Sequence, residues 1–147
     1  MINDPFITTP QKLLNKLKEN RIPDFMYVGF PKTGSTWLYE ILQELPEFSL
    51  PPEKEIHYFD RNPKYPSSNF YSKSYVFNRI INPKWSYLAF GQTTVNFIKF
   101  NSSRAKFYFK LYFKTYNDNW YLSLFNGSKG ITGDVTPSYC LLDNQIF

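Results

Sequence analysis

The stretch GFPKTGST, at positions 29–36, has the residue types needed to hold a phosphate group. Successive backbone N–H groups in a glycine-containing turn, placed at the start of a helix, form an anion site. Ser35 and Thr36 add hydroxyl donors, and Lys32 adds a positive charge. The two glycines and the final threonine match the loop G-x-x-x-x-G-K-[ST] of nucleoside triphosphatases, but Ser35 stands where that loop has its lysine. Lys32 should therefore reach a different atom, such as the bridging oxygen of a shorter donor.

A carboxylate and an imidazole stand two residues apart in EKEIHYFD, positions 53–60. On an extended strand such residues point the same way, so Glu55 and His57 would face one site. Together they are suited to take a proton from a substrate hydroxyl, and either is a candidate general base. A lone histidine is more often structural than catalytic, but the residues around His57 favour the catalytic interpretation.

The loop and this block resemble the PAPS-dependent sulfotransferases, where PAPS is 3'-phosphoadenosine 5'-phosphosulfate. PKTGSTW, at 31–37, is similar at every position to their P-K-[ST]-G-[ST]-T-W loop. KEIHYFD, at 54–60, resembles the K-E-x-H-[FY]-F-D block of the carbohydrate and heparan-type members. WYLSLF at 120–125 and GDVTPSY at 133–139 resemble the W-Y-x-x-x-F helix and the G-E-x-[ST]-P-x-Y segment of the same group.

The resemblance implies a set of donor-binding residues: Lys32, Thr33, Gly34, Ser35, Thr36 and Trp37. Lys32 would also act catalytically by helping the leaving phosphate depart. Trp37 would lie against the adenine, although a plain core position explains it equally well. Glu55 would be the general base, with His57 orienting or assisting.

The same resemblance implies that three residues line the substrate cleft: Thr136, Ser138 and Tyr139. A Thr-Pro turn that ends a strand is an equally good structural explanation for them. Some relatives have a lysine before the threonine that helps to hold the sulfate, but Val135 stands there in this chain. That contribution is either missing or supplied elsewhere.

The activity implied is transfer of a sulfuryl group from PAPS to a hydroxyl or amine, with a carbohydrate as the expected acceptor. A sulfuryl group carries less charge than a phosphoryl group, so a lysine and backbone donors suffice without a metal. The expected partners are the nucleotide donor and a glycan, with no nucleic acid and no membrane.

Two alternatives remain open. A P-loop kinase or nucleotide-binding protein would use Asp134, at a strand end, as a magnesium ligand, although the missing lysine after Gly34 counts against it. A non-catalytic or truncated sulfotransferase is the other. The family's R-D-P-type strand end and later serine, which bind the 3'-phosphate, are expected downstream of Phe147. We therefore expect the N-terminal half of a domain, completed by a downstream segment or a partner.

The elements around these motifs predict an α/β fold with a parallel sheet, like the P-loop-related sulfotransferase domain but incomplete at its C-terminus. The expected elements are strands at 25–30, 56–59 and 130–135 and helices from 35 or 36 to about 46 and at 119–125. We expect one partial domain over 1–147, with an insertion at about 61–119 that contains a helix at 104–116. A lead-in helix is expected from Thr9 to about Asn20.

Composition is consistent with a folded chain that binds an anion. The 147 residues are 42% hydrophobic and 20% aromatic and carry a net charge of +5, with the lysines and arginines scattered along the chain. The single cysteine, Cys140, excludes an internal disulfide and a cysteine-rich metal site. The N-terminus does not read as a signal peptide and no run reaches the ~20 apolar residues of a membrane span, so a cytoplasmic location is expected.

Overall fold

The computed structural model describes residues 21–30, 32–62, 64–65, 79–99 and 101–143. Its elements, in chain order, are β1 (Phe25–Tyr27), α2 (Ser35–Glu44), α4 (Pro83–Ile98), α5 (Ser102–Phe113), α6 (Asp118–Ser123), β2 (Gly133–Val135) and the 3-10 helix η1 (Pro137–Leu141). The lead-in helix expected at 9–20 lies outside the described residues. Within the described ranges, no helix is long and apolar enough to cross a membrane.

A two-stranded parallel sheet joins residues that are more than one hundred positions apart. β1 pairs with β2 so that Phe25 lies opposite Gly133 and Met26 opposite Asp134. A Cβ atom at Gly133 would lie 2.4 Å from the Phe25 ring, so glycine leaves the space that this ring fills. The predicted strands at 25–30 and 130–135 are confirmed, although each is three residues long, and the fold is α/β with a parallel sheet.

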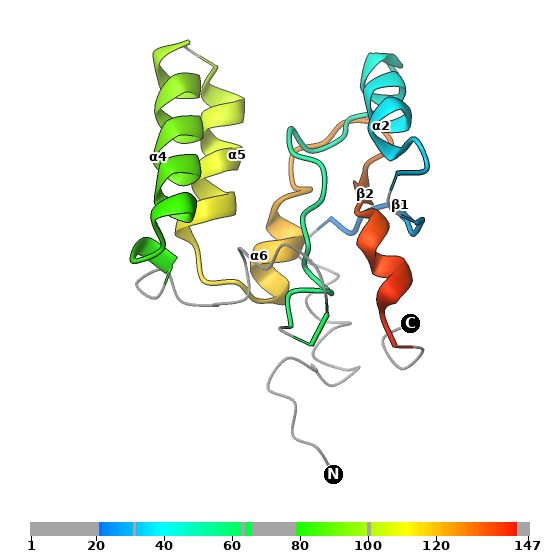
Figure 1. Cartoon of the computed structure of the whole chain (residues 1–147). Coiled ribbons are helices and arrows are strands. Elements are labelled where there is room, and N and C mark those ends of the chain that lie inside the picture. The colour runs from blue at the N-terminus through cyan, green and yellow to red at the C-terminus, as the bar shows by residue number, and fades with distance from the viewer. Residues whose placement is uncertain (1–20, 31, 63, 66–78, 100, 144–147) are drawn as a thin grey trace.

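Helices α4 and α5 form a hairpin at one side of the molecule, and α2 and the sheet lie at the other (Figure 1). The side chain of Asn82 caps α4 by accepting from the backbone N–H groups of Lys84 and Trp85. α5 confirms the helix predicted at 104–116. α4 was not predicted, because its sequence has apolar residues on both sides and lacks the polar face expected of a surface helix.

The largest core cluster lies between the helices and the segment that precedes them, not on the sheet. It contains Ile56 and Tyr58 together with buried residues of α4, α5, α6 and the turns beside them. Tyr58 stacks on Tyr121 of α6 with ring centroids 4.4 Å apart. A smaller cluster of Tyr65, Tyr139 and Leu142 packs against Met26 of β1 and Phe59.

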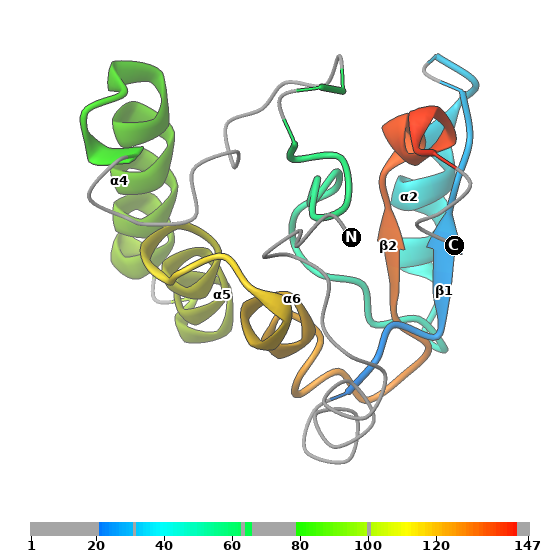
Figure 2. The ribbon, with the colours of Figure 1, turned by 90° about the horizontal axis from the view of Figure 1, so that it is seen from below.

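Segment 51–60 runs through the centre of the molecule, between the helical hairpin and the sheet (Figure 2). Four hydrogen bonds from four different elements hold it: Tyr39 OH to Pro51 O at 2.5 Å, Tyr108 OH to Glu53 Oε2 at 3.1 Å, Glu55 N to Val135 O at 3.0 Å, and Tyr58 N to Tyr139 OH at 3.0 Å. The segment therefore takes its conformation from α2, α5, β2 and η1.

The strand predicted at 56–59 is wrong. The backbone there is irregular, and Glu55 and His57 have positive φ angles of 62° and 54°. Non-glycine residues rarely adopt this left-handed conformation, which costs on the order of 1–3 kcal/mol each. The tertiary hydrogen bonds on either side impose it, so the local alternation of side chains does not decide the backbone.

Candidate functional site

The loop between β1 and α2 has the left-handed turns of an anion-binding loop. Lys32 and Gly34 have φ angles of 66° and 85°, and the Thr33 hydroxyl donates to the carbonyl oxygen of Phe30 at 2.7 Å. No side chain caps the N-terminus of α2, and no acidic residue stands in its first turn. The positive end of the helix dipole is therefore directed at the loop, where an anion is favoured.

The Lys54 ammonium joins this loop to the carboxylate of Glu55. Its Nζ atom lies 2.7 Å from the Thr36 hydroxyl and 3.3 Å from that of Ser35. It also forms an ion pair with Glu55 Oε1 at 2.9 Å. Sequence reasoning gave Lys54 no role, because its position beside the glutamate does not show that its side chain reaches a helix eighteen residues away.

Glu55, His57 and Asp60 form a chain of three ionisable side chains. Glu55 Oε2 lies 3.5 Å from His57 Nε2, and the Nδ1 side of the same ring lies 2.8 Å from Asp60 Oδ2. Asp60 is fully buried and also accepts a 2.5 Å hydrogen bond from the Ser138 hydroxyl. The hydrogen bond from His57 Nδ1–H to Asp60 fixes the orientation of the imidazole ring, with Nε2 toward Glu55.

The charges in this chain shift the pKa values of its buried members. Burial alone would lower the pKa of His57, but the hydrogen bond and charge of Asp60, with the charges of Glu55 and Asp134, raise it overall. Burial alone would raise the pKa of Asp60, but the hydrogen bonds from His57 and Ser138 and the imidazole charge lower it overall. The arrangement favours a carboxylate paired with an imidazolium, beside the half-exposed carboxylate of Glu55.

A second buried network surrounds Asp134 on β2. Its Oδ1 atom accepts from the Thr136 hydroxyl at 2.6 Å, and its Oδ2 atom accepts from Tyr139 at 2.8 Å and Tyr121 at 3.0 Å. Burial raises the pKa of Asp134, and these hydroxyl donors act in the opposite direction. Tyr139 also accepts from the backbone N–H of Tyr58. The network therefore anchors the segment that contains His57.

The residues expected to line the substrate cleft divide between these two networks. Thr136 and Tyr139 are fully buried, and their hydroxyls bind Asp134 instead of facing an open cleft. Ser138 is half-buried, and its Oγ lies 3.3 Å from His57 Nδ1, beside its bond to Asp60. Ser138 thus contacts the Glu55–His57–Asp60 chain, whereas the hydroxyls of Thr136 and Tyr139 belong to the Asp134 network. Asp60 connects Ser138 with His57. It belongs to the KEIHYFD block at 54–60, but the sequence analysis gave it no role.

The residues expected to bind the donor lie together at the loop and the first turn of α2. Ser35 is buried, and the other described members of the set are exposed: Lys32, Thr33, Gly34, Thr36 and Trp37. Trp37 is 67% exposed, so the alternative in which it is a core residue is wrong. Its indole is free to lie against a flat ligand.

No family model matches this chain, and no curated protein or solved structure matches it either. In the part of the chain that the structure describes, no group of three or more His, Cys, Asp or Glu side chains could hold a metal ion.

Proposed function

We propose that this chain binds PAPS and transfers its sulfuryl group to a hydroxyl or amine, with a carbohydrate as the expected acceptor. One observation carries the proposal. The carboxylate of Glu55 and the hydroxyls of Ser35 and Thr36 share one lysine, Lys54, at 2.9, 3.3 and 2.7 Å from its ammonium. The candidate base and the candidate anion loop are thus parts of one site, although they come from different segments. The proposed fold is the P-loop-related sulfotransferase domain.

At the donor end, the loop supplies positive potential without a bound metal. The uncapped first turn of α2 and the hydroxyls of Ser35 and Thr36 would bind the 5'-phosphate. Lys32, which precedes the glycine, would reach over the loop to the oxygen that bridges phosphorus and sulfur. That oxygen gains negative charge as the sulfur–oxygen bond breaks, so a cation placed there stabilises the transition state more than the ground state. Trp37 would cover the adenine.

Lys54 would be the second cation of the site. It lies between the loop and the base, which is where the transferred group must pass. Val135, which occupies the place of a sulfate-binding lysine in some relatives, is 2% exposed and has no charge. We assign that contribution to Lys54, whose ammonium would exchange a hydroxyl contact for a sulfuryl oxygen when the donor binds.

At the acceptor end, Glu55 is placed to remove a proton. Its side chain is 40% exposed, so an incoming hydroxyl has access to it. The acceptor oxygen would attack sulfur as the bridging sulfur–oxygen bond breaks, the proton would pass to Glu55, and adenosine 3',5'-bisphosphate (PAP) would leave. His57 contacts Glu55 and is oriented by Asp60, so these two residues would position the carboxylate.

The kinase alternative has less support from the geometry. It requires Asp134 as a magnesium ligand, but Asp134 is fully buried and both of its carboxylate oxygens accept hydrogen bonds from hydroxyls. Freeing an oxygen for a metal would break at least one of these bonds.

A thermal-shift titration with PAP, compared with ATP in the presence and absence of magnesium, tests the donor site. Ligand at one hundred times its dissociation constant stabilises a native protein by about 2.7 kcal/mol, or several degrees for a chain of this size. We expect metal-independent stabilisation by PAP. Stabilisation by magnesium and ATP alone would favour the kinase, and no response to any nucleotide would favour the non-catalytic alternative.

The Glu55→Gln variant tests the base. It should bind PAP like the wild type but fail to release PAP from PAPS in the presence of a panel of glycans. Glu44→Gln, which alters an exposed carboxylate at the end of α2, is the matched control and should leave turnover unchanged. Wild-type turnover in Glu55→Gln would exclude Glu55 as the base.

A further inference from the structure

Acidic residues are absent from a long part of the sequence, although basic residues are frequent there. Between positions 61 and 117 there is no aspartate or glutamate, and ten of the seventeen lysines and arginines lie in this range. They are Arg61, Lys64, Lys73, Arg79, Lys84, Lys99, Arg104, Lys106, Lys110 and Lys114. The remainder of the chain carries all twelve acidic residues and seven basic ones. The helical hairpin of α4 and α5 therefore belongs to a strongly positive segment, and the sheet and α2 to a negative one.

The outer side of α4 exposes large apolar side chains to solvent. Three of its residues are buried, Trp85, Ala89 and Asn96, and the first two belong to the core cluster. The opposite side carries Tyr87, Phe90, Phe97 and Ile98, which are 80%, 53%, 77% and 67% exposed. Lys84 is the one charged residue in the whole helix. We call this side of the hairpin, together with Ile81 and Phe109, the hairpin face.

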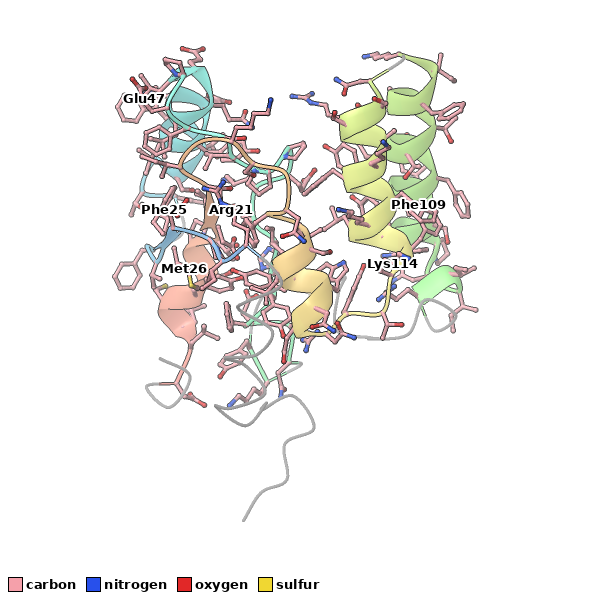
Figure 3. The ribbon with its side chains drawn as sticks, turned by 180° about the vertical axis from the view of Figure 1, so that it is seen from behind. Arg21, Phe25, Met26, Glu47, Phe109 and Lys114 are labelled. Carbon is pink, nitrogen blue, oxygen red and sulfur yellow. The ribbon has the colours of Figure 1, made fainter. Side chains whose placement is uncertain are left out.

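The apolar strip continues from α4 onto α5. Phe90 contacts Phe113 edge to face at 5.4 Å between ring centroids, and Phe113 stacks on Phe109 at 5.5 Å. An open depression lined by Pro83, Lys84, Tyr87 and Leu88 lies at the start of α4. Figure 3 shows Phe109 and Lys114 on this side of the molecule, away from Arg21 and Phe25 at the sheet.

Exposed cations surround the strip. They are Lys84, Lys99, Lys106 and Lys114. Aromatic and aliphatic side chains that enter the boundary between headgroups and acyl chains, flanked by lysines that meet anionic headgroups, are the combination that binds proteins to membrane surfaces. We propose that the hairpin face docks onto an anionic lipid bilayer.

Charge and apolar area together select this occupant over others. A second copy docked symmetrically would bring two positive faces together, without a carboxylate from either hairpin to compensate. A polyanionic glycan or nucleic acid would satisfy the cations but would offer no apolar layer in which to bury Ile81 and Ile98, which are 70% and 67% exposed. The proposal departs from the expectation, drawn from composition, that no membrane takes part. It does not depend on the proposed sulfotransferase activity.

Co-sedimentation of the full chain with vesicles tests the proposal. We expect binding to phosphatidylcholine vesicles that contain phosphatidylserine, little binding to phosphatidylcholine alone, and weaker binding as salt is added. The double variant Lys99→Glu/Lys106→Glu should lower partitioning on the order of 25-fold or more, because each cation near an anionic surface contributes about fivefold. Lys129→Glu, at an exposed position outside the hairpin, should change it much less.

A second pair of variants tests the apolar part of the face. Phe97→Ser/Ile98→Ser should weaken binding at least about tenfold, whereas Leu141→Ser, at an exposed apolar position outside the hairpin, should not. Equal binding to neutral and anionic vesicles, or undiminished binding by either hairpin variant, would overturn the proposal. Retention on heparin without binding to vesicles would show that the face takes a polyanionic chain, and self-association lost in the Phe97 variant would show that it takes a second copy.

Discussion

Replacing Tyr139 with phenylalanine should separate the anchoring of the candidate site from the general stability of the fold. The Tyr139 hydroxyl donates to Asp134 Oδ2 at 2.8 Å and accepts from the backbone N–H of Tyr58 at 3.0 Å. Tyr121 donates to the same carboxylate oxygen at 3.0 Å. Each of the variants Tyr139→Phe and Tyr121→Phe removes one donor from Asp134. Only Tyr139→Phe also leaves the Tyr58 N–H without this acceptor, and because both rings are buried, water does not readily replace the lost bonds.

The magnitudes follow from this difference. Loss of a hydrogen bond to a charged group costs about 1.5–3 kcal/mol, and leaving a buried amide unsatisfied costs about 1–3 kcal/mol more. We therefore expect Tyr121→Phe to lower the free energy of unfolding by about 1.5–3 kcal/mol and Tyr139→Phe by about 2.5–6 kcal/mol. For a chain of this size, each 1 kcal/mol lowers the melting temperature by roughly 2–4 °C.

Urea denaturation measures the free energies, and NMR of the histidine ring measures the local effect. His57 is the only histidine in the chain, so its ring signal reports directly on segment 55–60. It should move in Tyr139→Phe, where the Tyr58 N–H is released, and stay near its wild-type position in Tyr121→Phe. Equal destabilisation of the two variants, or an unmoved histidine signal in Tyr139→Phe, would refute the anchoring role.

Two further predictions concern the charges of the site. His57 has a raised pKa, so it stabilises the folded chain fully below its unfolded pKa near 6.5 and this contribution is lost as the pH rises through the folded value. Asp60→Asn removes the hydrogen bond and the charge that most raise this pKa, so the stability gained on acidification should shrink or change sign in the variant. Urea titrations at pH 5.5 and 8 measure this, and an unchanged pH dependence of the free energy of unfolding would count against the His57–Asp60 pairing. Lys54→Gln should weaken PAP binding about tenfold or more in calorimetry, because a charge-assisted hydrogen bond is lost. Lys54→Arg should recover part of the affinity. If Lys54→Gln binds PAP as tightly as the surface control Lys129→Gln, Lys54 does not contact the nucleotide.

The sequence predicts those elements whose signals are local. The apolar run before Gly29 and the helical spacing after Gly34 are enough to predict β1, the loop and α2. Helix α4 was missed although Asn82 and Pro83 form a readable helix start, because apolar residues occur on both of its sides and only one side packs against α5. A periodicity argument has no information about a helix face that remains apolar and exposed.

Segment 53–60 shows the opposite failure. Ile56 and Tyr58 are buried as strand alternation requires, but the backbone between them is left-handed at His57. Glu55 and His57 still come within 3.5 Å of each other, so their expected proximity is observed with a different geometry. The role of Lys54 depends on its contact with Thr36 of α2, and that of Asp60 depends on its contact with Ser138 of η1. Sequence spacing alone does not reveal such contacts.

Two backbone hydrogen bonds hold the part of the chain that contains the left-handed residues Glu55 and His57. The backbone of Glu55 is tied to Val135 of β2, and that of Tyr58 is tied to Tyr139 of η1. Strained conformations persist only where the surrounding structure over-determines them, and these two bonds, with the buried His57–Asp60 pair, do so here. The Glu55 carboxylate, at 40% exposed, remains outside the buried part. The segment thus combines a constrained backbone with an accessible carboxylate beside the loop, which is the arrangement that the proposed role of Glu55 as general base requires.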